Sequence, residues 1–239
     1  MALSWRFRMR WLDLLFAHWP VDESQLTAHL PRGLELDLFE GEAWLGIVPF
    51  TMADMAPRGV PAVLRLSTFP EINVRTYVRH RGEAGVWFLS LDAANRVIVE
   101  GGRRVFGVPY LRAEMASIRD GPSIRDGPTV RYRSRRTDRR GRPARFEATF
   151  RSTGPPARAA PGSLDAWLTD RLRLFSTDRQ GRIRRTRIAH ASWPLQPATA
   201  EIAVNTMAAA HGIVLPARPP RLLFAERLDV RAWLPDGPD

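Results

Sequence analysis

Alternating polar and apolar residues dominate the first half of the chain. Residues 72–79 alternate strictly, whereas residues 42–52 form an almost continuous apolar run. A period of two predicts a strand with one buried face, and a short apolar run fits a strand buried on both faces. A turn at residues 82–85 leads into residues 86–92, which predicts a hairpin. Residues 53–70, rich in Pro and Arg, predict a long loop or lid.

The second half repeats this pattern with arginine at the polar positions. Residues 130–136 and 146–150 alternate on either side of Gly141, which predicts a hairpin with one face buried and a charged face in water. Further strands are predicted at residues 182–189 and 222–233. The chain is therefore expected to be mostly β, with an α+β character supplied by a few short helices.

Two short helices have recognisable N-termini. Asp22 can cap the first, with Gln25 completing a capping box. Ser163 can cap the second, whose apolar face is predicted to consist of Leu164, Trp167, Leu168, Leu172 and Phe175.

Two segments interrupt the strand pattern without dividing the chain. A tandem hexamer at residues 117–128 contains Asp-Gly twice, which is typical of turns, and predicts a duplicated surface loop. Residues 154–162 form a connector rich in Pro and Ala. Because neither half alone has enough strands to close a core, we predict one domain over residues 1–239.

All 36 basic residues are arginine, and the chain of 239 residues contains no lysine. A lysine amine can condense with a carbonyl substrate as a Schiff base, whereas a guanidinium stays protonated. Cysteine is also absent, which excludes disulfides and fits a reducing cytoplasm. No apolar stretch approaches the roughly 20 residues that span a bilayer, so we expect a cytoplasmic protein without a membrane partner.

The formal charge of +11 raises the alternative of nucleic-acid binding. Residues 131–145 contain eight arginines in fifteen positions. Their alternation with apolar or small residues favours a solvated sheet face over a designed electropositive surface. The nucleic-acid alternative predicts an affinity that falls steeply with salt.

Common catalytic and cofactor motifs are absent. There is no Gly-x-Ser-x-Gly, no Gly-x-Gly-x-x-Gly, and no phosphate-binding loop with its lysine. The histidines have no metal-ligand spacing and are interpreted as ordinary surface or partly buried imidazoles: His18, His29, His80, His190 and His211. The sequence therefore predicts neither a cofactor nor a metal.

Polar residues on one strand face provide a candidate site. Glu71, Asn73, Arg75 and Tyr77 share a face by the period-two rule, and so should the following set on the next strand: Phe88, Ser90 and Asp92. A carboxylate, an amide and a guanidinium in an apolar concavity would orient a small polar ligand. The alternative is that this face lies in water, where a Glu71–Arg75 pair contributes little.

Several segments resemble the YqjF-like family of bacterial proteins, and together they cover nearly the whole chain: residues 11–20, 30–37, 43–50, 69–78, 90–96 and 193–197. That family in turn resembles acetoacetate decarboxylase. The resemblance implies a cone-shaped, mostly antiparallel β-barrel with a buried pocket and a tendency to form homo-oligomers. The distant link rests on residues 26–37 and on residues 102–109, where Gly-Arg leads to Gly-Val-Pro.

The decarboxylase places its Schiff-base lysine and a second lysine directly after that proline, where this chain has Tyr110 and Leu111. Neither side chain can form an imine. Glu71 matches a pocket glutamate of the decarboxylase. The resemblance thus implies a pocket with Glu71 and Tyr110 as candidate catalytic residues. Together with the strand pattern, this gives the following candidate ligand-binding residues: Asn73, Arg75, Phe88, Asp92 and Arg103.

Two hypotheses follow from these residues. The first is a protein that binds a small acidic or aromatic metabolite without turnover. The second is an enzyme that uses Glu71 as a base and Tyr110 or Arg75 to stabilise an enolate or oxyanion, in the manner of a hydratase, lactonase or isomerase.

Overall fold

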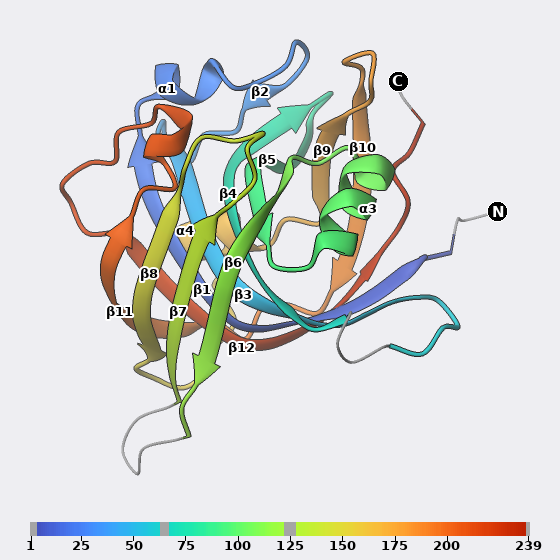
Figure 1. Ribbon diagram of the computed structural model, residues 1–239. Coiled ribbons are helices and arrows are strands. Elements are labelled where there is room, and N and C mark those ends of the chain that lie inside the picture. Colours follow the sequence, from blue (N-terminus) through green and yellow to red (C-terminus); the bar gives the residue numbers. More distant parts are fainter. Residues whose placement is uncertain (1–3, 63–66, 122–127, 238–239) are drawn as a thin grey trace.

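The computed structural model describes residues 4–62, 67–121 and 128–237 (Figure 1). Strands make up most of these residues. They are β1 (Phe7–Val21), β2 (Glu35–Leu36), β3 (Ala43–Pro57), β4 (Phe69–His80), β5 (Glu83–Ala93), β6 (Tyr110–Arg119), β7 (Thr129–Arg136), β8 (Arg145–Ser152), β9 (Arg173–Thr177), β10 (Ile183–His190), β11 (Gln196–Asn205) and β12 (Arg221–Ala232).

The helices are short. They are α1 (Glu23–Thr27), α3 (Arg96–Phe106), α4 (Leu164–Thr169) and a 3₁₀ turn at Ala209–His211. Helix α3 lies beside β9 and β10 (Figure 1). None of the helices in the described ranges is long and apolar enough to cross a membrane.

Hydrogen bonding between strands closes the sheet into a barrel. Its order runs β5-β6-β7-β8-β11-β12-β1-β3-β4, and β4 pairs again with β5. Of the three remaining strands, β2 pairs with β4, whereas β9 and β10 pair with each other and connect β5 to β12 on the other side of the shared strands. The strands shared between the two closures, β5, β4, β3, β1 and β12, are therefore covered on both faces.

This double coverage creates two separate apolar cores. Ile72 and Val74 of β4 pack with the side chains of β7 and β8, including Tyr132 and Phe146. On the opposite face, Val48, Phe50 and Leu91 pack with residues of β9, β10 and α3. Because neighbouring residues of a strand point to opposite faces, each shared strand contributes alternately to the two cores.

Most predicted strands and turns are confirmed. The pairing of β4 with β5 and of β7 with β8 confirms both hairpins, and the arginines of β7 lie on its exposed face except Arg136. The barrel is mostly antiparallel, as expected, although β5 pairs in parallel with β6 and β9.

Other local predictions were wrong. β3 continues to Pro57, so the predicted loop at 53–70 is shorter, and residues 63–66 lie outside the described part of the chain. Gln25 does not complete a capping box, because its Oε1 accepts from the Val214 amide instead. The second helix ends at Thr169, and Phe175 belongs to β9 because β5 and β10 offer it backbone partners. In the duplicated hexamer, residues 117–119 continue β6, and residues 122–127 are outside the described ranges.

Candidate functional site

A cavity of about 300 Å³ lies on the β9–β10 side of the shared strands. Helix α3 forms one wall through Ile98, Gly102 and Phe106. Strand β4 contributes three alternate residues, Glu71, Asn73 and Arg75. The remaining lining is mostly apolar and includes Met9, Trp11, Phe16, Phe50, Met52, Phe88, Tyr110 and Trp193. The period-two prediction therefore holds for these three residues of β4, whose side chains face an interior and not water.

Glu71 and Tyr110 form a buried pair in this cavity. The Tyr110 hydroxyl donates to Oε2 of Glu71 at 2.8 Å. Burial raises the pKa of Glu71 to about 8; the hydrogen bond from Tyr110 opposes this shift, and the charge of Asp92 adds to it. The pKa of Tyr110 is raised well above its ordinary value, first by burial and then by Glu71. Glu71 is therefore mostly protonated at pH 7, and Tyr110 remains a neutral donor.

Arg75 is a buried cation without a carboxylate partner among the described residues. The residue is 9% exposed, and one terminal nitrogen donates to the Leu168 carbonyl at 3.1 Å and to the Tyr77 hydroxyl at 3.3 Å. The guanidinium carbon lies 5.5 Å from the centre of the Phe16 ring. In the described structure Nε of Arg75 has no hydrogen-bond partner, and neither has Oδ1 of Asn73. Both atoms retain hydrogen-bonding capacity, which is costly in a buried site.

Tyr77 does not line the cavity but holds Arg75 and His18 behind it. Its hydroxyl lies 2.9 Å from the Leu168 carbonyl, to which it donates, and 2.7 Å from Nε2 of His18. With its hydrogen committed to Leu168, Tyr77 accepts from His18, which must then carry its hydrogen on Nε2. Burial and the nearby charge of Arg75 lower the pKa of His18 well below its ordinary value, so this imidazole is neutral.

A β-bulge separates the three residues of β5 that were predicted to share a face. Val74 pairs with Ser90, but Arg75 pairs with Phe88, so Leu89 is the extra residue. Phe88 consequently lines the cavity, whereas Ser90 and Asp92 do not. The prediction of one shared face for Phe88, Ser90 and Asp92 was therefore wrong, because strict alternation cannot anticipate a bulge.

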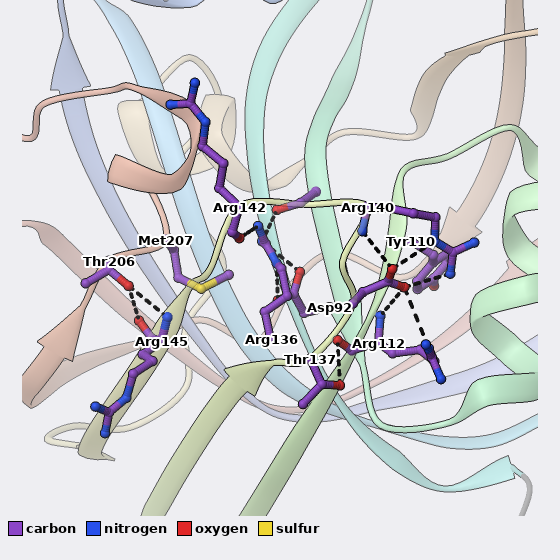
Figure 2. Close-up of polar contacts among 12 residues, drawn as sticks. Asp92, Tyr110, Arg112, Arg136, Thr137, Arg140, Arg142, Arg145, Thr206 and Met207 are labelled. Carbon is purple, nitrogen blue, oxygen red and sulfur yellow. Dashed lines mark hydrogen bonds and ion pairs between the residues drawn. The ribbon is translucent and has the colours of Figure 1, made fainter.

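Asp92 is engaged on the opposite side of the sheet by Arg136. Nε and a terminal nitrogen of Arg136 each donate to the Asp92 carboxylate at 2.9 Å, and the same terminal nitrogen donates to Ser90 at 3.0 Å. Both charged side chains are almost completely buried, at 1% and 0% exposure. Figure 2 shows the Arg136 guanidinium directed at Asp92 and also donating to the Arg142 carbonyl. This fully paired arrangement indicates a structural ion pair rather than a ligand contact.

Arg103 lies outside the cavity as well. Its terminal nitrogen NH1 donates to the backbone carbonyl of Tyr110 at 2.9 Å, and its side chain lines a separate, wider cleft. The structure thus brings together Glu71, Asn73, Arg75, Phe88 and Tyr110 and leaves Asp92 and Arg103 elsewhere.

Sequence reasoning missed the contribution of helix α3. Asn95 caps this helix by accepting from the amides of Val97 and Ile98, and Gly107 ends it in the left-handed conformation. An Asn cap followed by a Gly terminus was a readable signal. No group of three or more potential metal ligands occurs within the described ranges.

Residues 8–229 match DUF2071, a family described as an uncharacterized conserved protein. The chain belongs to this family. It is 43% identical over 229 residues to the uncharacterized protein YqjF of Bacillus subtilis strain 168, covering 96% of this chain and 91% of YqjF. The DUF2071 assignment confirms the resemblance drawn from the sequence blocks.

Solved structures with similar folds are acetoacetate decarboxylase-like. Acetoacetate decarboxylase from Legionella pneumophila superposes with a TM-score of 0.65 at 14% identity, covering 97% of this chain and 89% of the enzyme. An acetoacetate decarboxylase-like enzyme from Sphingomonas wittichii RW1 gives 0.65 at 13% identity, with 99% and 95% covered. The enduracididine biosynthesis enzyme MppR gives 0.68 at 12% identity, with 98% and 88% covered. These similarities establish the fold of this DUF2071 protein and not its reaction.

Proposed function

We propose that this protein binds a small carboxylate with an apolar body in the cavity beside β4. The observation that carries the proposal is Arg75, a buried guanidinium with an unpartnered Nε and no carboxylate partner among the described residues. A planar guanidinium matches a carboxylate in shape and charge, and a ligand carboxylate would supply the missing counterion.

The charge of the neighbouring groups favours an anionic ligand. Glu71 has a pKa of about 8 and is therefore mostly uncharged at pH 7, so it does not neutralise Arg75. Oδ1 of Asn73 is buried without a partner in the described structure and can accept from a hydroxyl or N–H group of the ligand.

The rest of the cavity sets the size and polarity of the ligand. A volume of about 300 Å³ is at the lower end of the range for small-molecule sites. The walls distant from β4 are apolar and include Met9, Trp11 and Met52. A short aliphatic or aromatic acid fits this combination better than a highly hydroxylated metabolite.

A structural neighbour supports the same ligand class. The enzyme MppR, similar in fold, has been solved in complex with pyruvate, which is a small carboxylate. Because this chain has no lysine, a lysine imine cannot hold the ligand here. We therefore expect reversible binding through charge and hydrogen bonds.

Calorimetric titration with acetate, butyrate, hexanoate and phenylacetate tests the proposal, with the corresponding primary amides as uncharged controls. We expect the acids to bind and the amides to bind at least about tenfold more weakly, since a charge-assisted hydrogen bond contributes roughly 1.5–3 kcal/mol. Arg75→Gln should remove the preference for acids, whereas Arg133→Gln, on the exposed face of β7, should retain it. Equal binding of acids and amides would refute the proposal.

A second candidate is acid-base catalysis on such a ligand. The observation in its favour is the raised pKa of Glu71, which places a proton-transfer group near working pH next to the donor Tyr110. Proton exchange at the carbon next to the carboxylate, followed by NMR in deuterated water, measures this activity for each binding acid. Loss of exchange in Glu71→Gln with retained affinity supports the enzyme, and recovery of every acid without deuterium supports a binding protein.

A further inference from the structure

A second concave region lies next to the carboxylate cavity and has a different character. This cleft, of about 890 Å³, runs between the C-terminal end of α3 and the turn that joins β9 to β10. Four arginines line it from these two sides: Arg103 and Arg104 from α3, and Arg179 and Arg184 from the β9–β10 hairpin. We refer to it as the arginine cleft. Phe88 and Val108 line both the arginine cleft and the cavity.

Two of these arginines are held in place by backbone carbonyls. Arg103 donates to the Tyr110 carbonyl at 2.9 Å, and Arg184 lies at 3.4 Å from the Val105 carbonyl. Each of these contacts uses one terminal nitrogen and leaves the other donors of the guanidinium for a ligand. A guanidinium that is fixed before binding loses less conformational freedom when the ligand arrives.

The other two arginines have no directly bonded partner in the described part of the chain, although Arg104 lies close enough to Glu100 for their charges to interact. Within the described ranges, neither Arg104 nor Arg179 makes a side-chain hydrogen bond or ion pair. The end of α3 favours positive charge, since the helix carbonyls there carry partial negative charge. The partial charge of the helix end is not a full counterion for these arginines.

The acidic residues of the cleft form their ion pairs with arginines that do not line it, although the charges of Arg103 and Arg104 also act on Glu100. Glu100 pairs with Arg140 at 2.9 Å, and Asp178 pairs with Arg182 at 2.7 Å. The two histidines that line the cleft, His29 and His211, lie with their rings 6.0 Å apart. Burial, followed by the charges of Arg136 and His29, lowers the pKa of His211 to about 4, so that His211 adds no charge at pH 7. The cleft is therefore lined by four arginines and two carboxylates, and both carboxylates are already paired with other arginines.

We propose that the arginine cleft binds a phosphate-type oxyanion carried by a small molecule. Guanidinium groups from two walls can surround a tetrahedral, multiply charged anion, and a concave site strengthens their combined field. Trp87 and Pro109 line the same cleft and offer apolar surface to the remainder of the molecule. This site is distinct from the carboxylate cavity and extends beyond the function proposed above.

Calorimetric titration with pyrophosphate at low and at physiological salt tests the site. The wild-type protein should bind pyrophosphate, and Arg104→Gln/Arg179→Gln should weaken binding by about tenfold or more, because charge-assisted hydrogen bonds are lost. The matched control is Arg133→Gln/Arg158→Gln, which removes the same charge from exposed positions outside the cleft. That control should stay within about twofold of the wild-type affinity. Thermal unfolding of each variant verifies that it is folded.

Three results would overturn the proposal: no binding of millimolar pyrophosphate, equal weakening in both double variants, or tighter binding of citrate than of pyrophosphate. Equal weakening combined with binding of a single-stranded oligonucleotide would indicate a diffuse nucleic-acid surface instead. Arg75→Gln should leave pyrophosphate affinity unchanged, and the Arg104→Gln/Arg179→Gln variant should still bind hexanoate. The proposal for the arginine cleft and the proposal for the cavity can thus be refuted independently.

Discussion

Gly102 of α3 packs directly against the ring of Tyr110. A Cβ atom at position 102 would lie 2.5 Å from two ring carbons, much closer than such atoms approach in proteins. A Cβ atom on the preceding residue, Gly101, would have no neighbouring atom within 4 Å. Two adjacent glycines in one helix therefore have different roles, and only Gly102 is required for the approach of α3 to the cavity.

This contrast predicts opposite effects of two similar substitutions. Gly102→Ala should destabilise the protein by about 1–3 kcal/mol, because the ring of Tyr110 or the helix must move. Gly101→Ala should stabilise it by roughly 0.5–1 kcal/mol, since alanine loses less backbone entropy in a helix. Urea unfolding measures both values. A stabilising Gly102→Ala would mean that Tyr110 moves aside without strain.

The buried carboxyl of Glu71 predicts a pH-dependent stability. Its pKa is about 8 in the folded protein and 4.5 as an ordinary value, so the folded state retains a proton that the unfolded state loses between these pH values. The free energy of unfolding should therefore fall as pH rises through this window, with a slope of at most about 1.4 kcal/mol per pH unit. The contribution of the Glu71 proton to the free energy of unfolding is complete below pH 4.5 and is lost by pH 8.

Glu71→Gln supplies the control for this prediction, because glutamine does not titrate. Urea unfolding at several pH values should show the difference between wild type and Glu71→Gln changing most between about pH 5 and pH 8. Parallel curves over this window would mean that Glu71 ionises normally in the folded protein.

Ionisation of Glu71 should also weaken the binding of an anion beside Arg75. Above pH 8 a second negative charge enters the cavity, so the affinity for hexanoate should decrease, while hexanoate itself stays ionised throughout. Titration calorimetry at pH 6.5 and pH 9 measures the change. In Glu71→Gln the two affinities should agree, and a similar loss in that variant would assign the effect to another group.

Replacing Arg136 by Met should destabilise the protein much more than replacing its neighbour Arg135 by Met. Arg136→Met leaves Asp92 buried without its partner and should cost about 3–5 kcal/mol. Arg135 pairs with Glu114 on the surface, where their side chains are 61% and 68% exposed, and Arg135→Met should cost less than about 1 kcal/mol. Urea unfolding compares them. Adding Asp92→Leu to Arg136→Met should recover part of the loss, and failure to do so would point to Ser90 or to packing.

Alternation predicted several of the strands, including β4, β5, β7 and β8, but it missed β1 and β11, assigned Phe175 of β9 to a helix, and did not settle every strand face. Alternation along β4 correctly put Glu71, Asn73 and Arg75 on one side, because a regular strand has a period of two. The same rule failed on β5, where the bulge at Leu89 separates Phe88 from Asp92. A bulge depends on how a strand pairs with its neighbour and has no reliable signal within the strand itself.

Helix α3 and the partner of Asp92 illustrate a second limit. The double glycine inside α3 lowers its helix propensity, and its value appears only when Tyr110 packs against it. Arg136 looked like one of many arginines in an exposed hairpin, yet its side chain is 1% exposed. Which arginine turns inward depends on the barrel closing around it.

Strand β4 separates the cavity from the larger packed core, and this separation has an evolutionary consequence. Positions 71, 73 and 75 face the cavity, whereas positions 72 and 74 face the packed core on the other side. Under the proposed function, substitutions at the first set change ligand preference without altering side chains in the packed core. Deleting one residue within β4 would move the residues on one side of the deletion to the opposite face of the strand. Charged side chains would then enter the packed core. The residues that face the cavity can therefore diverge by substitution, while the length of β4 must be preserved.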